Sequence, residues 1–354
     1  MSFALHELTD GGQPAADVAA LLAGFLAGAE HSLEIAIYDL SLPETVEAVL
    51  SEALAAAAAR GVVTRLVYNV DHWAHRPYPP PPMADPAALA RLGVPSRPVS
   101  GVPDLMHHKY VVRDAGGAAG AVWTGSTNWT ADSWTREENL VLELPSPGLA
   151  ADYRRNFEEL WESGSVQASG HFDPGWSSVD VEGRAVQARP IFSPGRGRAM
   201  SHLAADRIGQ ARRRLRVCSP VLTSGPVLAS LAEIPAGLDC RVVYDRTQMA
   251  EVLSQWGADP HGAWKAPVFR EAMSRLAHAS KVTTPYAPGT VHDYMHAKFV
   301  VADDVVLAGS YNLSRSGEMN AENVVELRDP AIADRLAAFA DRLFDKYRQV
   351  GAAG

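Results

Sequence analysis

Two short strings in the chain carry the same ionisable residues at the same spacing. They are "MHHKYVVRD" (106–114) and "MHAKFVVAD" (295–303), each with a histidine, one spacer, a lysine, four residues and an aspartate. Side chains alternate between the two faces of a strand, so we expect His107 to lie beside Lys109 and His296 beside Lys298. Each string therefore predicts an imidazole next to an ammonium group.

The residues that follow each string also repeat. "GSTN" contains Ser126 and Asn128, and "GSYN" contains Ser310 and Asn312. The glycine permits a tight turn, and the serine and asparagine side chains are donors that can bind an anionic oxygen. Ten residues past each asparagine comes a Glu-Asn pair, which begins at Glu138 in the first copy and at Glu322 in the second.

These residue types suit chemistry at a phosphorus atom. If the two copies pack about a pseudo-twofold axis, their histidines, lysines, serines and asparagines surround one tetrahedral anion. Displacement of an alcohol from a phosphodiester needs a nucleophile on one side and a proton donor on the other. One neutral imidazole can attack and the other, protonated, can protonate the leaving alkoxide, while the lysines stabilise charge on the nonbridging oxygens.

The paired His-X-Lys-X4-Asp strings, each followed by Gly-Ser-X-Asn and a glutamate, resemble the phospholipase D superfamily over essentially the whole chain. The resemblance implies that His107 is the nucleophile and His296 the general acid. It implies that the phosphate is held by Lys109, Lys298, Asn128 and Asn312, with Ser126 and Ser310 beside them. It also implies that Glu138 and Glu322 each orient an imidazole. The first copy departs from the pattern by a longer loop, "AGGAAGA" (115–121).

Three residues of the strings are expected to stay outside the chemistry. Asp114 and Asp303 stand seven residues past each histidine, on the opposite strand face, and we expect them to be structural members of ion pairs. His108 has no counterpart in the second copy, where Ala297 stands, and we expect it to face away from the site.

The elements around the strings predict a duplicated α/β fold. Each half opens with a strand and a helix, continues with alternating strands and helices, and closes with an amphipathic helix near residues 148–163 or 330–349. This pattern favours two pseudo-twofold-related halves with mixed, largely parallel sheets. We assign residues 1–165 and 188–354 to the halves. The Gly- and Ser-rich residues 166–187 read as a linker across the surface.

Composition and net charge limit the kinds of partner that we expect for the protein. The 354 residues carry a formal charge of −9, so the net field of the molecule does not attract polyanions. No secretory leader and no apolar run long enough to cross a bilayer are visible, and we expect a cytoplasmic monomer that meets a membrane substrate from the surface. The histidines of "HDYMH" (292–296) could bind zinc on a helix, but their neighbours predict a loop and a strand. We therefore expect no metal and no cofactor.

The substrate is less well defined than the reaction. The first hypothesis is hydrolysis of a phospholipid to phosphatidic acid and its head group through a phosphohistidine, with possible transfer to another alcohol. The alternatives are a cardiolipin-synthase-like phosphatidyltransferase, a metal-independent nuclease and a non-catalytic scaffold. A nuclease needs a basic track beside the site, for which the arginines around "ARRRLR" (211–216) are candidates. Trp73, Trp129, Trp134 and Trp264 either line the mouth of the site or pack beneath loops.

Overall fold

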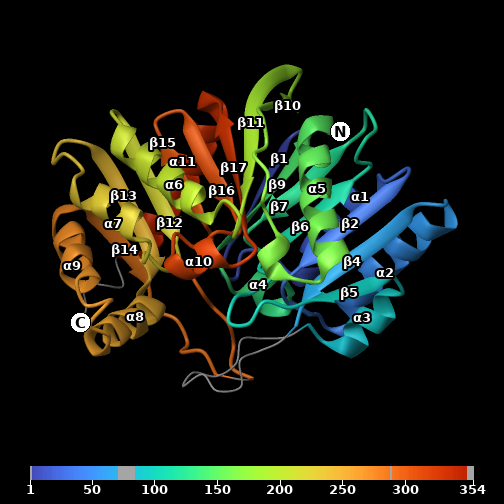
Figure 1. The fold of residues 1–354 in the computed structure, drawn as a ribbon, viewed down its shortest axis with the longest axis horizontal. Helices are drawn as coiled ribbons and strands as arrows, with labels where there is room; N and C mark the ends of the chain where they lie inside the picture. Colours follow the sequence, from blue (N-terminus) through green and yellow to red (C-terminus); the bar gives the residue numbers. More distant parts are fainter. Residues whose placement is uncertain (1, 71–83, 288, 349–354) are drawn as a thin grey trace.

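The computed structural model describes residues 2–70, 84–287 and 289–348, and shows two α/β halves lying side by side (Figure 1). The first sheet has the strand order β1-β9-β7-β6-β2-β4-β5, and the second has the order β10-β11-β17-β16-β15-β12-β13-β14. Apart from the added edge strand β10, each strand of the second sheet repeats the position of one in the first. The internal repeat predicted from the two strings is therefore a repeat of the whole fold.

The first half contains the elements β1 (Ala4–Leu8), α1 (Ala15–Ala27), β2 (Ser32–Ile37), β3 (Leu40–Ser41), α2 (Glu44–Ala59), β4 (Val63–Asn69), α3 (Pro86–Leu92), β5 (Ser96–Val99), β6 (Lys109–Arg113), β7 (Ala121–Gly125), β8 (Trp129–Thr130), α4 (Ala131–Thr135), β9 (Asn139–Pro145), α5 (Pro147–Ser163) and the 3₁₀ turn η1 (Val166–Ala168). The two-residue strands β3 and β8 pair with each other, apart from the main sheet. Residues 71–86 of the sequence form a proline-rich insert between the repeated elements, and residues 71–83 of it lie outside the described residues.

The second half contains the elements β10 (Ser177–Val181), β11 (Arg184–Phe192), α6 (Gly197–Gln210), β12 (Arg214–Ser219), α7 (Gly225–Ala232), β13 (Asp239–Asp245), α8 (Arg246–Ala258), α9 (Lys265–Arg275), β14 (Ala277–Lys281), β15 (Phe299–Ala302), β16 (Val305–Gly309), α10 (Arg315–Met319), β17 (Asn323–Arg328) and α11 (Pro330–Arg348). The predicted opening strand and helix and the predicted closing helix are present in both halves.

Strand direction corrects one part of the sequence prediction. The sheets are mixed, but in the two large sheets the described parallel pairs are those of β2-β4-β5 and β12-β13-β14. These are the strands joined by helical crossovers. Short loops join β6 to β7 and β15 to β16, longer connections join β7 to β9 and β16 to β17, and all four pairs are antiparallel. The expectation of largely parallel sheets was therefore wrong.

The predicted linker is also more ordered than its composition indicated. Residues 166–187 contain η1, β10 and the start of β11, and the hairpin of β10 and β11 extends the second sheet beside β17. Val166 and Val179 are fully buried. The hairpin also packs against α5 of the first half, so this segment forms part of the contact between the halves.

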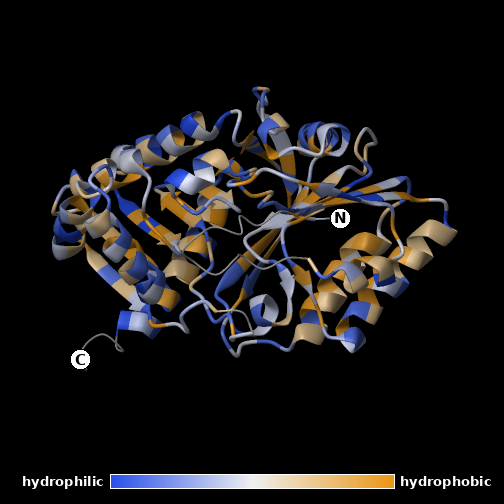
Figure 2. Ribbon diagram, turned by 60° about the horizontal axis from the view of Figure 1, so that its bottom comes forward, coloured by the Kyte–Doolittle hydropathy of each residue, from blue (hydrophilic) through white to orange (hydrophobic). Residues whose placement is uncertain are grey.

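The core is arranged in layers. One continuous buried cluster contains the facing sides of both sheets together with α5 and α11, and separate clusters fill the outer sides beneath α1–α3 and beneath α6–α9. Apolar residues accordingly concentrate on the inner strands and on the helix faces that meet them (Figure 2). Burial of apolar surface between two sheets fixes the halves against each other, and it fixes any site built at their junction.

The closing helix of the first half shows how local sequence sets an element. Ser146 accepts a hydrogen bond from the Leu149 amide, Pro147 stands in the first turn, and Gly164 ends the helix with a φ of 67°. A serine cap, an early proline and a left-handed terminal glycine are the usual signals for these boundaries. This helix holds one face of the first sheet.

Candidate active site

The main chain holds each motif histidine against the opposite half. The His107 amide donates to the Ala321 carbonyl at 2.9 Å, and the His296 amide donates to the Glu138 carbonyl at 3.0 Å. Both histidines stand just before a strand rather than inside it, because β6 begins at Lys109 and β15 at Phe299. The two strings therefore meet at the junction between the halves.

The imidazole side chains are also held across this junction. His107 Nδ1 lies 2.8 Å from Glu322 Oε2 of the second half. His296 Nδ1 lies 3.1 Å from Asn139 Oδ1 and 3.1 Å from Glu137 Oε2 of the first half. When Nδ1 donates to these acceptors, the Nε2 lone pair of each ring is left for chemistry.

Glu138 does not have the role predicted for it. Its carboxylate accepts hydrogen bonds from Lys346 Nζ at 2.8 Å and from the Tyr347 hydroxyl, both on α11. Glu137 lies at His296 instead, although the alignment of the two Glu-Asn dipeptides predicts Glu138 there.

The main chain gives a different register between the two copies. The Ser126 amide donates to the carbonyl of Leu140, and the Ser310 amide donates to the carbonyl of Asn323. The second partner follows its serine one residue sooner than the first partner does. The first half has one extra residue between the serine and its partner on the neighbouring strand, so Asn139 occupies the position of Glu322. The consecutive glutamates of "REEN" were the available signal of this shift.

The two serines serve the acceptors that hold the histidines. Ser126 Oγ donates to Asn139 Oδ1 at 2.6 Å, and Ser310 Oγ donates to Glu322 Oε2 at 2.6 Å. Each hydroxyl proton is therefore engaged inside the protein. This arrangement differs from the predicted binding of phosphate by the serine side chains, and it makes both serines positioning residues.

The two asparagines are placed differently from the serines. Asn128 Oδ1 and Asn312 Oδ1 are buried and have no hydrogen-bond partner among the described residues. No residue in the described ranges receives a hydrogen bond from either amide NH₂ group. Their predicted role in holding phosphate stays a prediction, and these unengaged side chains are compatible with it.

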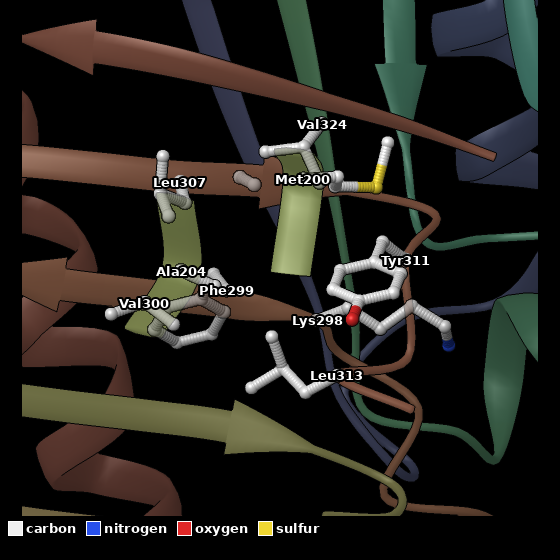
Figure 3. Close-up of a pocket in the computed structure, with 10 residues that line it drawn as sticks. Met200, Ala204, Lys298, Phe299, Val300, Leu307, Tyr311, Leu313 and Val324 are labelled. Carbon is white, nitrogen blue, oxygen red and sulfur yellow. The ribbon is translucent and has the colours of Figure 1, made fainter. Parts of the chain in front are cut away.

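The lysines have equivalent contacts in the two halves. Lys109 Nζ donates to the His107 carbonyl and Lys298 Nζ to the His296 carbonyl, each at 2.6 Å. Burial lowers the pKa of Lys109 to about 7, and burial and then Lys109 lower the pKa of Lys298 strongly. The stem of Lys298 lines a small apolar cavity with Phe299 and Tyr311 (Figure 3). An anion between the two ammonium groups would favour their charged forms.

The two histidines have different electrostatic surroundings. Burial and then Lys109, Lys298 and His296 lower the pKa of His107 well below its ordinary value. Burial also lowers the pKa of His296 to about 4, although Glu137 opposes that shift. Because each histidine is close enough to the lysines of both halves to be influenced by them, the four groups belong to one site.

The carboxyl groups beside the two imidazole rings also differ in pKa. Burial raises the pKa of Glu322 to about 8. Burial would also raise the pKa of Glu137, but His296 and the hydrogen bonds from Ser133 and Asn139 lower it to about 2. His296 therefore has an ionised carboxylate beside it at neutral pH, whereas the carboxyl group beside His107 holds its proton more strongly.

The motif aspartates were expected to be structural members of ion pairs, and their main partners in the structure are backbone amides. The Asp114 carboxylate accepts hydrogen bonds from the amides of residues 30–32, and the Asp303 carboxylate from those of residues 212–214. Both aspartates have a positive φ, near 52° and 54°. Each therefore fixes the start of the strand next to its own, β2 or β12.

His108 lies between the halves rather than among the reacting groups. Its ring is fully buried against Tyr110 and Phe192, and its Nδ1 lies 3.2 Å from Asn323 Nδ2. The tryptophans were expected either to line the mouth of the site or to pack beneath loops, and the structure gives the burial of three of them. Trp129 and Trp134 are buried, Trp264 is exposed, and Trp73 lies outside the described residues.

Most arginines of the predicted basic stretch are paired with acids. The pairs are Arg184–Asp329, Arg189–Glu326, Arg196–Asp173, Arg207–Glu326, Arg213–Asp304, Arg214–Asp334 and Arg216–Asp341. The positive charge of these side chains is compensated locally, so they do not form a continuous basic track.

A duplicated α/β fold that presents two histidines and two buried lysines at its junction defines a phosphodiesterase-type enzyme. A sequence profile of the family described as "Cardiolipin synthase, PLD-like domain" matches residues 22–161 and again residues 205–344. The chain belongs to this phospholipase D-like family, and each half carries one copy of the family's domain.

Individual proteins are similar over different lengths. The chain is 31% identical over 137 residues to the mitochondrial cardiolipin hydrolase of Xenopus laevis and 29% identical over 134 residues to that of Xenopus tropicalis. These matches cover 39% and 38% of this chain but only 58% and 56% of the relatives' own lengths.

A solved structure shares the whole fold. The phosphatidylserine synthase of Haemophilus influenzae Rd KW20 matches with a TM-score of 0.62 at 13% identity, over 98% of this chain and 86% of that one. At this identity the likeness concerns the fold. Among the described helices, none is both long and apolar enough to span a membrane.

Proposed function

We propose that this protein hydrolyses a phospholipid to phosphatidic acid and a head-group alcohol through a covalent phosphohistidine. The observation that carries the proposal is the crossed pair of contacts in which Glu322 holds His107 and Glu137 holds His296. This arrangement supports two imidazoles acting on one phosphorus atom, each with its Nε2 free.

In the first step, His107 Nε2 attacks phosphorus. The phosphorus–nitrogen bond forms as the bond from phosphorus to the head-group oxygen breaks, and His296 gives its Nε2 proton to the leaving alkoxide. Lys109 and Lys298 stabilise the nonbridging oxygens. A bound phosphodiester adds negative charge beside His296, which raises the proton affinity of that ring.

In the second step, His296 acts as a base. It removes a proton from water, the water oxygen attacks phosphorus, and the phosphorus–nitrogen bond breaks to release His107 and phosphatidic acid. A second alcohol in place of water gives transphosphatidylation by the same path. A cardiolipin-synthase-like transfer would use this route.

The difference between the two carboxyl groups supports the assignment of roles. The ionised Glu137 stabilises an imidazolium at His296, which is the form that an acid needs. The raised pKa of Glu322 offers less stabilisation to a charged His107, and a nucleophile must be neutral. The roles implied by the family resemblance agree with these electrostatics.

The phospholipid substrate is supported by the names of the relatives and by the charge of the surface. The similar proteins are called a cardiolipin hydrolase and a phosphatidylserine synthase. The alternative of a nuclease draws mainly on phosphate contacts by free basic residues, and the arginine stretch is largely paired with acids.

The test is release of a head group. Wild-type protein is incubated with vesicles of phosphatidylcholine, phosphatidylglycerol or phosphatidylethanolamine, and separately with single- and double-stranded DNA, each with and without EDTA. We expect phosphatidic acid from lipid, unchanged by EDTA because side chains alone supply the nucleophile and the acid. If the protein cleaves DNA and leaves every lipid intact, the lipid assignment is wrong and the protein is a nuclease.

A further inference from the structure

The two halves differ at the residue two positions past the central strand. β2 pairs with β6 so that Ile37 lies opposite Lys109, and β12 pairs with β15 so that Cys218 lies opposite Phe299. Continuing this register, Asp39 of the first half corresponds to Val221 of the second. An acid therefore stands at one of two equivalent positions.

Asp39 lies beside the groups assigned to phosphate chemistry. Its neighbour Tyr38 packs edge-on against the His107 ring, with ring centroids 4.7 Å apart, and Lys109 Nζ lies 4.8 Å from the centre of the same tyrosine ring. The Asp39 carbonyl accepts a hydrogen bond from the Trp129 amide, directly after Asn128. Asp39 is thus placed between the nucleophile string and an asparagine of the Gly-Ser-X-Asn turn.

The side chain of Asp39 is buried, and one of its two carboxyl oxygens has no hydrogen-bond partner among the described residues. The residue is 3% exposed, and the oxygen without a partner there is Oδ1. Burial raises its pKa to about 7, with Lys109 opposing that shift and Glu137 adding to it. A buried carboxyl oxygen with no partner is costly, so a functional explanation is required.

Compensation of the charge of Lys109 does not explain the acid. Lys298 has the same main-chain contact at the same distance as Lys109. It is at least as strongly affected by burial, yet Val221 stands at the position equivalent to Asp39. A buried lysine in this fold therefore does not need an acid there.

A carboxyl group is also unsuited to bind the phosphate itself. Phosphate oxygens are acceptors, and the lysine and asparagine groups of the site supply donors for them. An additional acceptor at the same place repels the anion, unless it meets a donor that the substrate carries beyond the phosphate. Hydroxyl and ammonium groups on a lipid head group are such donors.

We infer that Asp39 forms a subsite for the alcohol portion of the substrate, where its carboxyl group accepts a hydrogen bond from a hydroxyl or ammonium group. This inference rests on the proposed phospholipid hydrolysis and specifies its substrates. Glycerol-type and ethanolamine-type head groups fit the subsite, whereas choline, which has no N–H or O–H donor once it is esterified, does not. Tyr286 of the second half lies near the Asp39 carboxyl group, because burial and then Asp39 raise the pKa of this tyrosine.

The test compares substrates with and without a donor. Wild type, Asp39→Asn and Asp39→Val are assayed on phosphatidylglycerol, phosphatidylethanolamine, phosphatidylcholine and bis(4-nitrophenyl) phosphate. We expect Asp39→Val to lower kcat/KM for the first two lipids by about tenfold or more, as for one lost hydrogen bond to a charged group. Turnover of the other two substrates should stay within about twofold, which also shows that the variant is folded.

A matched control is available in β2, the strand that precedes Asp39. Glu34 is a buried acid of β2 that lies near Arg65 and Arg154, away from the histidines, so Glu34→Gln should leave the ratios between substrates unchanged. An equal loss on all four substrates in both Asp39 variants, or no loss on any, would overturn the subsite alone. Wild-type protein that cleaves bis(4-nitrophenyl) phosphate but none of the lipids would overturn the phospholipid assignment and the subsite with it.

Discussion

His107 and Glu322 stand 215 residues apart in the chain, yet the imidazole Nδ1 lies 2.8 Å from the carboxylate Oε2. The reciprocal contact joins His296 to Glu137 and Asn139. Neither half can orient its own histidine, because the acceptor comes from the other half. Both copies are therefore needed to build one site.

The first prediction separates the two histidines by their chemistry. With bis(4-nitrophenyl) phosphate, whose leaving group needs no proton, His296→Ala should still form the phosphohistidine and then stall. We expect a burst of one equivalent of 4-nitrophenol, followed by turnover lowered by about 10³-fold. His107→Ala should give neither burst nor turnover in the same stopped-flow assay.

His108→Ala is the neighbouring control, and it should retain most of the turnover because its ring packs between the halves. A full burst from His107→Ala, or steady turnover in His296→Ala equal to wild type, would contradict the assigned roles.

The second prediction uses two adjacent glutamates. Glu137→Gln removes the negative charge beside His296 and should lower kcat by about tenfold to a hundredfold with little change in KM, because it weakens the acid rather than binding. Glu138→Gln changes a carboxylate held by Lys346 and Tyr347, so kcat should change little while thermal stability falls. A large loss of kcat in Glu138→Gln with little change in Glu137→Gln would show instead that Glu138 is the counterpart of Glu322.

That register shows where the sequence was sufficient and where it was not. The matched strings predict the repeated fold, in which each string contacts the opposite half. They do not reveal the single extra residue between Ser126 and its partner on β9, because the dipeptide "EN" stands ten residues past the asparagine in both copies. Only the pairing of Ser126 with Leu140, and of Ser310 with Asn323, reveals it.

Other features depended on tertiary contacts. β7 and β16 run antiparallel to the strands before them because the connections are short. The amino-acid composition does not encode the geometry of these connections. The hairpin of β10 and β11 packs on α5 and β17, which the glycine and serine residues of the predicted linker did not indicate. Asp39 was not predicted as a site residue because no recurring motif marks it, and only comparison of the two folded halves reveals the acid.

The third prediction concerns the aspartate that ends the second string. Asp303 accepts amide hydrogen bonds that start β12, and Asp303→Asn loses part of this set and the charge that strengthens it. We expect the free energy of unfolding to fall by about 1–3 kcal/mol in chemical denaturation. Activity per folded molecule should stay near that of wild type at low temperature. A large loss of kcat with unchanged stability would give Asp303 a part in the chemistry.

The fourth prediction follows from the lowered pKa of His296. Because its pKa is about 4 in the folded protein and near 6.5 when unfolded, the unfolded chain binds more protons between these values. The stabilising contribution is therefore complete above pH 6.5 and is lost as the pH falls toward 4. We expect the free energy of unfolding of wild type, relative to His296→Asn, to fall by about 1.4 kcal/mol per pH unit in this window. Urea denaturation at pH 4.5, 5.5, 6.5 and 7.5 measures this difference, and parallel curves for the two proteins would show that His296 is not a buried neutral ring.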